Sequence, residues 1–595
     1  MMTPIMSNKL KVEFNYKIID ELYDVFCLVT DKKYFKFGAE ILDIPLLDKN
    51  VCSICYESGK TLYILMKHDV ENKLKLKESL SKFPEFDYLS IAIKKSGELS
   101  KEILLQLLFN SLANFKSEEL KFNNLSGHLY CFSPSWIEHR NKDYAIMKIP
   151  CLDVRIAKNC LLKFDVHTFT SEELKNKMRF NKTKFEDYPK YVLSAYNTLR
   201  RKLKDDRDKA YIMKQAGNVK IEIPFMDIKN IDTFNQSKLG VIVKILEQFE
   251  KRFSNCARVE FETIPVYKTE DYTNVVAKEN RALIISRLKE VKIKIVDCIG
   301  EYYSQDFAEE IQKILLEKYF LKSTIGKRIS KDCLNIRVIH NAEYYRENDH
   351  HNDVFDDVSV QHITYEDSRD NVKNAIATII NELLIKDDLN KKKITLFDWD
   401  KLNFDEDITF GMKSDKEGIE KYYFMTVHRD GMFEISEEEL NLFKQQRYSE
   451  YVQIYSDSNN ICGMIIDHEN NINVVKRTGW ITMPEVFKIK KELASGNTKI
   501  RGKEKRDELM SSVLDIKTFK IDNEQYYFSG MIGNGMRWTI NKAANIRKIE
   551  CLGSSTLMFD KLLKLMNVTF VRNGQLTVIP FPFKYLREYI AKQSN

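Results

Sequence analysis

The segments Val358-Ser-Val-Gln361-His-Ile-Thr-Tyr-Glu366 and Asn381-Glu-Leu-Leu-Ile-Lys386 decide the fold prediction for this chain. The first segment predicts a strand from Val358 to Tyr365, and the second closes a helix predicted over 369–386. Strands and helices alternate in the same way from residue 250 to residue 390. Such alternation is typical of a parallel sheet flanked by helices, a Rossmann-like arrangement.

Three further strands and one more helix complete this region. The strands are expected at 258–262, 291–296 and 334–340, and the helix at 305–320. Ligands of such sheets bind beyond the carboxyl ends of the strands. We therefore expect functional side chains in the residues that follow His340 and Gln361.

The last two hundred residues follow another pattern. Asp430-Gly431 lies between two alternating apolar runs within 422–435, which is a strong signal for a β-hairpin. A helix is expected over 437–455 and a strand over 463–466, followed by further strands and a terminal helix. Antiparallel strands, a helix, another strand and a helix indicate an RNase H-like fold.

Composition sets wide limits. The chain has 595 residues, of which 43% are hydrophobic and 30% charged, and its net charge of +7 neither requires nor excludes nucleic acid. It has no run of eighteen apolar residues and no apolar signal segment, so we expect a cytoplasmic protein without a membrane partner. An odd number of cysteines, eleven, fits a reducing compartment. The expected class is a multidomain α/β protein, with an N-terminal α/β domain (1–175), a linker region (176–250) and two further domains (251–390 and 391–595).

The residues around the two opening segments suit a terminal phosphate. Such a group needs cationic or amide donors from two elements and an aromatic face for the first base. Tyr345 and Arg346 supply a ring and a guanidinium group, Gln361 an amide and Lys386 a point charge. The structural alternative is that Gln361 ends a buried strand and Lys386 stabilises a helix terminus.

This ordered set resembles the 5′-phosphate pocket of the MID domain of Argonaute proteins. Tyr345 precedes Gln361 by sixteen residues, and Lys386 follows it by twenty-five, close to the family's spacing. The family's lysine four residues after the tyrosine is replaced by Asp349, so Arg346 would take its place. The resemblance implies a Rossmann-like MID domain over 251–390 that binds a 5′-phosphorylated guide. The resemblance requires no cofactor, although it is compatible with Mg²⁺ at the guide 5′ phosphate.

The same resemblance implies a PIWI domain, an RNase H-like fold, over 391–595, with a degenerate nuclease centre. Lys413 stands where the first metal-binding aspartate is expected, and Arg587 stands at the last ligand position, after Pro580-Phe-Pro582. Asp467 is the one surviving acid, and His428-Arg-Asp430-Gly is interpreted as a hairpin turn. Cations at these positions would repel Mg²⁺, so we expect no guided cleavage.

Compact, degenerate prokaryotic Argonautes work with partner effectors. The DdmE type, the guide-binding half of a plasmid-defence pair with a helicase–nuclease, is the subclass that fits best. The expected partners are a DNA or RNA guide, complementary plasmid or phage DNA and an effector protein. A separate PAZ domain does not fit between 170 and 250, so no full PAZ domain is expected.

Two basic stretches are candidates for contacts with a nucleic-acid backbone. Arg200, Arg201 and Lys204 lie in a helix expected over 188–204, and Lys499, Arg501 and Lys503 lie near the PIWI-like region. A solvated helix face or loop is the alternative for both.

Other interpretations stay open. Cys52, Cys55, His128 and Cys131 have the spacing of a zinc site, although buried cysteines are the simpler interpretation. A second possible metal site is formed by the residues of one polar loop: His350, His351, Asp353, Asp356 and Asp357. The rival functions are an active RNase H-like nuclease, using Asp398, Asp400, Asp430 and Asp467, and a scaffold subunit of a defence complex that binds no guide.

Overall fold

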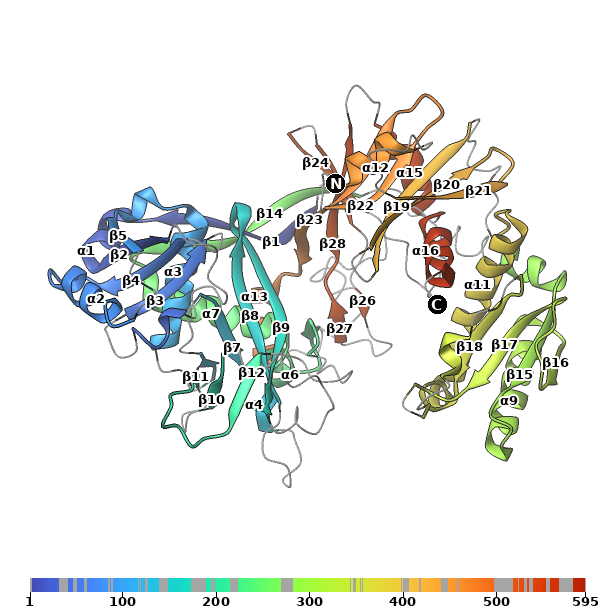
Figure 1. Ribbon diagram of the computed structural model, residues 1–595, viewed down its shortest axis with the longest axis horizontal. Coiled ribbons are helices and arrows are strands. Elements are labelled where there is room, and N and C mark those ends of the chain that lie inside the picture. Colours follow the sequence, from blue (N-terminus) through green and yellow to red (C-terminus); the bar gives the residue numbers. More distant parts are fainter. Residues whose placement is uncertain are drawn as a thin grey trace.

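The structure is a computed structural model of the 595-residue chain. It describes residues 3–30, 41–46, 51–57, 61–83, 86, 89–115, 117, 119–123, 127–138, 148–172, 189–193, 198–213, 223–268, 282–342, 344–345, 349–353, 355, 357–396, 399, 406–416, 419–439, 448–456, 460–496, 517–522, 524–528, 532–533, 539–552, 557–566 and 582–593. It is a mixed α/β protein with several sheets, as the sequence predicts (Figure 1). No helix among these residues is long and apolar enough to cross a membrane.

The N-terminal part contains a four-stranded antiparallel sheet in the order β3-β4-β2-β5. Its strands are β2 (Tyr23–Thr30), β3 (Val51–Glu57), β4 (Thr61–Lys67) and β5 (Leu89–Lys94). The helices of this part are α1 (Tyr16–Leu22), α2 (Asn72–Leu80) and α3 (Lys101–Asn110). Apolar side chains of β2 and β4 alternate toward α2 and form a core of their own, including Phe26, Ile64 and Leu76.

A long two-stranded ribbon connects this part to the rest of the chain (Figure 1). It consists of β1 (Thr3–Phe14) and β14 (Ala257–Lys268), which pair antiparallel from Phe14↔Ala257 to Thr3↔Val266. The expectation that the strand at 258–262 belongs to the parallel sheet is therefore wrong. Strands of that sheet are four to seven residues long, whereas β14 has twelve residues and finds a matching partner in β1.

A second group of antiparallel strands lies beside the ribbon. It comprises β6 (Lys121–Phe122), β7 (Leu129–Phe132), β8 (Lys148–Ala157), β9 (Leu161–Ser171), β10 (Tyr191–Leu193), β11 (Leu199–Arg201) and β12 (Ala210–Met213). The basic helix expected over 188–204 is wrong, because β10 and β11 pair antiparallel there. Tyr191, Val192 and Leu199 are buried in this pairing, and aromatic and β-branched side chains favour a strand.

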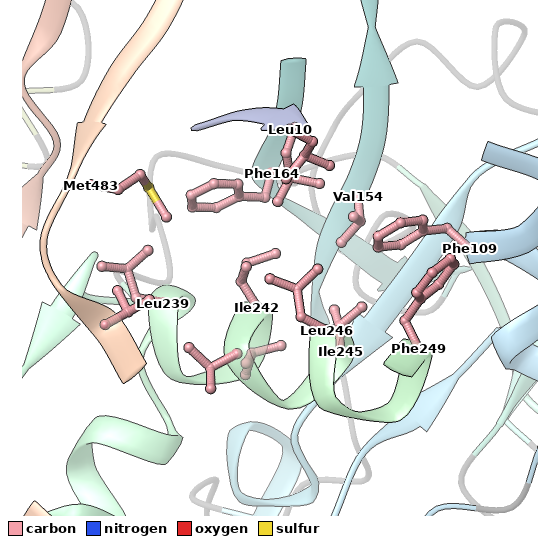
Figure 2. Close-up of a cluster of buried hydrophobic side chains, with 14 of the residues drawn as sticks. Leu10, Phe109, Val154, Phe164, Leu239, Ile242, Ile245, Leu246, Phe249 and Met483 are labelled. Atoms are coloured by element: carbon pink, nitrogen blue, oxygen red, sulfur yellow. The ribbon is translucent and has the colours of Figure 1, made fainter. Parts of the chain in front are cut away.

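Helix α7 (Lys238–Phe253) forms the base of the largest hydrophobic core. Figure 2 shows its side chains Leu239, Ile242, Ile245, Leu246 and Phe249 directed at residues from other elements. Those residues are Leu10 of β1, Phe109 of α3, Val154 of β8, Phe164 of β9 and Met483. One helix thus holds together strands that are far apart in the sequence. Helix α6 (Ile231–Asn235) and a small sheet of β13 (Met226–Asp227), β27 (Thr539–Lys542) and β26 (Ile532–Gly533) lie in the same region.

The predicted parallel sheet is confirmed. Its order is β16-β15-β17-β18, formed by β15 (Lys292–Asp297), β16 (Ser323–Gly326), β17 (Cys333–Ile339) and β18 (Val360–Thr364), and all three pairings are parallel. Helices α9 (Tyr302–Tyr319) and α11 (Val372–Lys391) bury apolar stripes against it. Gln361 is the second residue of β18 rather than its last, since the pairing of β18 with β17 continues to Thr364.

The C-terminal part is built on a large antiparallel sheet. Its first strands are β19 (Ile408–Lys416), β20 (Ile419–Val427), β21 (Phe433–Glu439), β22 (Ile461–Ile466) and β23 (Ile472–Met483). Its last strands are β24 (Lys517–Ile521), β25 (Glu524–Phe528) and β28 (Asn545–Cys551). The helices are α12 (Ser449–Ser456), α13 (Val486–Ala494), α15 (Phe559–Met566) and α16 (Pro582–Gln593). The hairpin at Asp430-Gly431 is confirmed, with Gly431 in the left-handed region at φ +80°.

The topology of this sheet departs from the RNase H-like expectation. Strand β22 pairs antiparallel with β19, whereas the fourth strand of an RNase H-like sheet runs parallel to the first. The helix between β21 and β22 has only eight residues, about 12 Å at 1.5 Å per residue. Because β21 runs in the same direction as β19 and β22 in the opposite one, β22 starts at the edge of the sheet where β21 ends.

Candidate functional site

Two of the predicted phosphate-binding residues meet in the structure. Lys386 lies on the face of α11 that covers β18, and its Nζ donates hydrogen bonds to Gln361 Oε1 and to the Val360 carbonyl, both at 2.7 Å. Burial lowers the pKa of Lys386; Lys584 and Lys592 lower it further, while Glu588 and Glu382 raise it. The ammonium group is thus held between an amide oxygen and a carbonyl oxygen. An anionic ligand would compensate the cost of burying its positive charge.

Lys386 lines a cavity of about 130 Å³ between the parallel sheet and the C-terminal helix. One water molecule needs only about 10–15 Å³ of such space, so a larger polar group can enter. The functional side chains of its wall come from the loop before β18, from β18, α11 and α16: His351, His362, Lys386, Asn390, Glu588 and Lys592. Helix α16 lies beside α11 (Figure 1), and its last turns reach the cavity wall through Glu588, Ala591 and Lys592.

His362 lines the cavity and has a buried polar atom. Its Nδ1 is buried and has no hydrogen-bond partner among the described residues. Burial, together with the charges of Arg337 and Lys386, lowers its pKa to about 4. The imidazole is therefore neutral near pH 7.

His351 is held in place by Asp349. The Asp349 carboxylate accepts hydrogen bonds from the His351 backbone N–H at 2.9 Å and contacts its Nδ1 at 2.6 Å. These bonds lower the pKa of Asp349. Asp349 therefore positions a cavity histidine and supplies no positive charge itself.

Tyr345 does not line the cavity. Its hydroxyl accepts a hydrogen bond from the His340 backbone N–H at 3.1 Å, and its ring packs edge-on against His350 and His351 at 5.1 and 6.0 Å. Its contact with the cavity therefore runs through His351. Tyr344, 62% exposed, stacks on His340 at 3.5 Å, and Arg346 lies outside the described residues.

Arg337 is a cation that the sequence pattern did not single out. It sits on buried β17, donates to Asp353 Oδ2 at 2.8 Å and lies over the Phe355 ring at 5.0 Å. Asp353 and Phe355 both line the cavity. A lone arginine inside an apolar strand gives no signal of a neighbouring pocket.

The described part of the cavity wall presents its carboxylates already engaged by basic side chains. Its two carboxylates are already paired: Asp353 with Arg337 and His350, and Glu588 with Lys584. Among the described residues, no group of three His, Cys, Asp or Glu side chains could hold a metal ion.

The three positions assigned to a degenerate nuclease centre do not converge. Lys413 forms an ion pair with Glu420 and lies over the Tyr422 ring, on the face of β19 opposite Phe410. Phe410 contacts Phe583 of α16, so Arg587 of α16 lies on the other side of the sheet.

The acids of the rival nuclease hypothesis are engaged in turns. Asp467 accepts hydrogen bonds from the Glu469 and Asn471 backbones within its own turn. Asp430 accepts one from the Met432 backbone. Asp398 and Asp400 lie outside the described residues.

The basic residues of β11 are partly committed to other contacts. Arg200 forms a two-bond ion pair with Asp206 at 2.6 and 2.7 Å, and Arg201 lies over the Tyr191 ring at 5.5 Å. Lys204 lies in the turn after β11. Lys499, Arg501 and Lys503 lie outside the described residues.

The cysteines considered for zinc lie in strands. Cys52 and Cys55 belong to β3, and Cys131 belongs to β7, where burial raises the pKa of each thiol. His128 contacts Asp153 at 3.1 Å and stacks between Tyr56 and Tyr130. Of the polar-loop residues, Asp356 lies outside the described residues.

Comparisons with known proteins leave the family undecided. No protein-family model matches the sequence, and no curated protein matches it. Among solved structures, the chain is similar to Clostridium butyricum Argonaute bound to a guide DNA with a 5′ deoxycytidine and a 19-mer target DNA. The two share 11% sequence identity over 99% of this chain and 98% of that chain, with a TM-score of 0.43. At so low an identity and TM-score, the likeness supports no statement about ligand or activity.

Proposed function

We propose that this protein is an Argonaute-like, guide-binding protein that holds the 5′ phosphate of a short nucleic-acid strand in the cavity beside Lys386. The observation that carries the proposal is the position of Lys386, which lines that cavity and donates a hydrogen bond to Gln361 behind the wall. His351, His362 and Lys592 complete a set of donors from four elements. Charge-assisted hydrogen bonds from several directions are what a terminal phosphate needs.

The charge balance of the cavity supports an anionic ligand. Its carboxylates are neutralised by Arg337 and Lys584, whereas Lys386 and Lys592 have no carboxylate partner within hydrogen-bond distance among the described residues. Burial disfavours the charged form of Lys386, and a bound phosphate would stabilise that charge. Tyr344, exposed beside His340, offers a ring for base stacking at the other end of the same loop.

The second part of the proposal is that the protein does not cut. Lys413 and Arg587, the positions that the resemblance assigns to metal ligands, are cations on opposite sides of the sheet, and the acids at Asp430 and Asp467 stabilise turns. The parallel-sheet unit takes the role of a MID domain and the antiparallel sheet that of a PIWI domain, without a full PAZ domain. A bound guide would direct the protein to complementary plasmid or phage DNA in the cytoplasm, and a helicase–nuclease of the kind that partners DdmE would supply the cleavage.

The experiment that tests this function is purification from the native host, followed by extraction, end-labelling and sequencing of any short nucleic acid bound to the protein. We expect a discrete population of short strands with 5′ phosphates, and its sugar chemistry identifies DNA or RNA guides. If no short strand copurifies and the purified protein ignores 5′-phosphorylated oligonucleotides, the scaffold function replaces this one.

A further inference from the structure

Three arginines gather on one face of the large antiparallel sheet. Arg477 of β23 lies directly opposite Arg547 of β28, and Arg547 lies opposite Tyr527 of β25. Arg587 of α16 belongs to the same group. Partial desolvation by the surrounding side chains lowers the pKa of Arg587, and so do the nearby charges of Arg547 and Arg477.

Alternation along the strands shows which way these side chains point. Val475 precedes Arg477 by two residues and Ile549 follows Arg547 by two, and both apolar residues belong to the core that α16 covers. Arg477 and Arg547 therefore project on the same face as that core.

Helix α16 reaches this face closely. An added Cβ at Gly463 of β22 would meet the Phe583 ring at 2.6 Å. Arg587 lies one helical turn beyond Phe583 and projects from the same side of the helix. The Arg477 backbone N–H donates to the Asn460 carbonyl at 2.8 Å, which places Arg477 next to the start of β22.

Among the described residues, no acid balances the charges of the three guanidinium groups. None of the three forms an ion pair or a side-chain hydrogen bond with another residue in the part of the chain that the structure describes, and Nε and Nη1 of Arg547 are buried without a partner there. Like charges that face each other across a pair of strands are destabilising. Within the described residues, the fold therefore concentrates positive charge at this point without compensating it.

The opposite face of the same two strands behaves differently. Lys476, next to Arg477, pairs with Glu550 at 3.0 Å. Lys548, next to Arg547, pairs with Glu550 at 2.9 Å and with Glu524. Basic residues on that face are matched by acids, so the unmatched arginines are a local feature and not a property of the whole sheet.

We propose that Arg477, Arg547 and Arg587 together bind a phosphate group of a nucleic-acid backbone. The planar guanidinium group donates two parallel hydrogen bonds to phosphate oxygens. Arg477 and Arg587 are exposed and Arg547 is half-buried, so the site is open to a long polymer. The choice of nucleic acid as that polymer rests on the function proposed above.

The site is separate from the cavity but close to it. Glu588 and Lys592 of α16 line the cavity, whereas Arg587 projects about 100° away from Glu588 around the helix. Lys592 is five positions after Arg587, which is a rise of about 7.5 Å along the helix axis. A strand whose 5′ end lies in the cavity can therefore reach the arginines with a later phosphate.

The test compares the double variant R477Q/R587Q with K548Q, which removes a paired lysine from the other face of β28. Binding of one short strand, with a 5′ phosphate or a 5′ hydroxyl, is measured over a range of salt concentrations. We expect R477Q/R587Q to weaken both strands by the same factor, about tenfold or more, and to reduce the slope of log K against log salt by about 1 to 2. K548Q should leave both quantities near those of the wild type. Wild-type affinity and slope for R477Q/R587Q would overturn the proposal.

Two further measurements distinguish backbone binding from binding of free phosphate and from a loss of folding. If inorganic phosphate raises the Tm of the wild type but not of R477Q/R587Q, while strand binding is equal, the site takes free phosphate and the backbone proposal fails. If the glutamine variant does not fold, R587K replaces it. This variant keeps the positive charge but loses the two parallel N–H donors of the guanidinium group, and it must still bind both strands more weakly than the wild type.

The outcomes separate this proposal from the proposed function. If the wild type shows no preference for a 5′ phosphate, but the arginine variants still bind both strands more weakly than the wild type does, the guide-end pocket is refuted and the arginine site is not. If the arginine variants bind both strands with wild-type affinity and keep the preference for a 5′ phosphate, the arginine site is refuted and the guide-end pocket is not.

Discussion

The Tyr585 hydroxyl of α16 donates a hydrogen bond of 2.5 Å to Asp388 of α11, and both side chains are fully buried. Asp388 also accepts hydrogen bonds from the Thr395 backbone N–H at 2.8 Å and from the Thr395 hydroxyl at 2.5 Å. Because α11 carries Lys386 and α16 carries Lys592, this buried group fixes the two helices that form the cavity.

Ionisation of Asp388 should make stability depend on pH. Burial raises the pKa of Asp388 from 3.8 to about 6, so the folded protein binds its proton more tightly than the unfolded chain. Above about pH 6 the buried charge of Asp388 lowers the free energy of unfolding in full. As the pH falls toward 4 the carboxylate takes up a proton, and the free energy of unfolding rises by up to about 3 kcal/mol. The difference between the free energies of unfolding of the wild type and D388N, measured from pH 4 to pH 7.5, should show this slope. A flat difference would contradict a raised pKa.

Tyr585→Phe should weaken the contact between the two helices. It removes a buried hydrogen bond to a carboxylate, so we expect a loss of about 1.5–3 kcal/mol in the free energy of unfolding. Tyr589→Phe, on the same helix and only partly buried, is the control and should stay within about 0.5 kcal/mol. Equal effects of the two changes in urea titrations would argue against the role of the Asp388 contact.

Gly240→Ala should disrupt the core shown in Figure 2. An added Cβ would lie 1.9 Å from the Phe234 carbonyl oxygen and 2.8 Å from the Asn235 Cα, both backbone atoms that cannot move alone. We expect a loss of at least the 1–3 kcal/mol typical of overpacking. Gly97→Ala, whose nearest contact would be at 3.9 Å, is the matched control. Thermal unfolding that ranks both variants equally would show that α6 and α7 do not approach as described.

Incubation of the guide-loaded protein with complementary target and Mg²⁺ or Mn²⁺ should give no cleavage. Asp467→Ala and Asp430→Ala should leave target binding unchanged, because both side chains serve local turns. Metal-dependent cleavage that disappears in Asp430→Ala would establish the rival nuclease instead.

Local patterns predict the elements that depend on neighbouring residues. The alternation around Gln361 and Lys386 indicates the parallel sheet, and Asp430-Gly431 indicates the hairpin. The helix prediction fails at Tyr191–Leu193 because that strand has three residues, too short for a period to show. Partners of β14 and β22 could not be predicted, because pairing with β1 and β19 depends on contacts distant in the sequence.

The candidate site shows the same division. The meeting of Lys386 with Gln361 follows from one strand and one helix twenty-five residues apart. Lys592 joins them from the C-terminal helix, more than two hundred residues later, where it resembles any surface lysine. Arg477 and Arg547 are equally inconspicuous, since only the register of β23 with β28 brings them together.

The most direct measurement is the affinity of the purified protein for one short strand carrying either a 5′ phosphate or a 5′ hydroxyl, compared between the wild type, K386A/Q361A and K391A. Lys391 lies on the same helix but is exposed and paired with Asp387 at 2.7 Å. We predict that the wild type and K391A prefer the phosphorylated strand about tenfold or more, and that K386A/Q361A loses this preference. Equal weakening of both strands in K386A/Q361A, or no preference in the wild type, would contradict the proposed 5′-phosphate site.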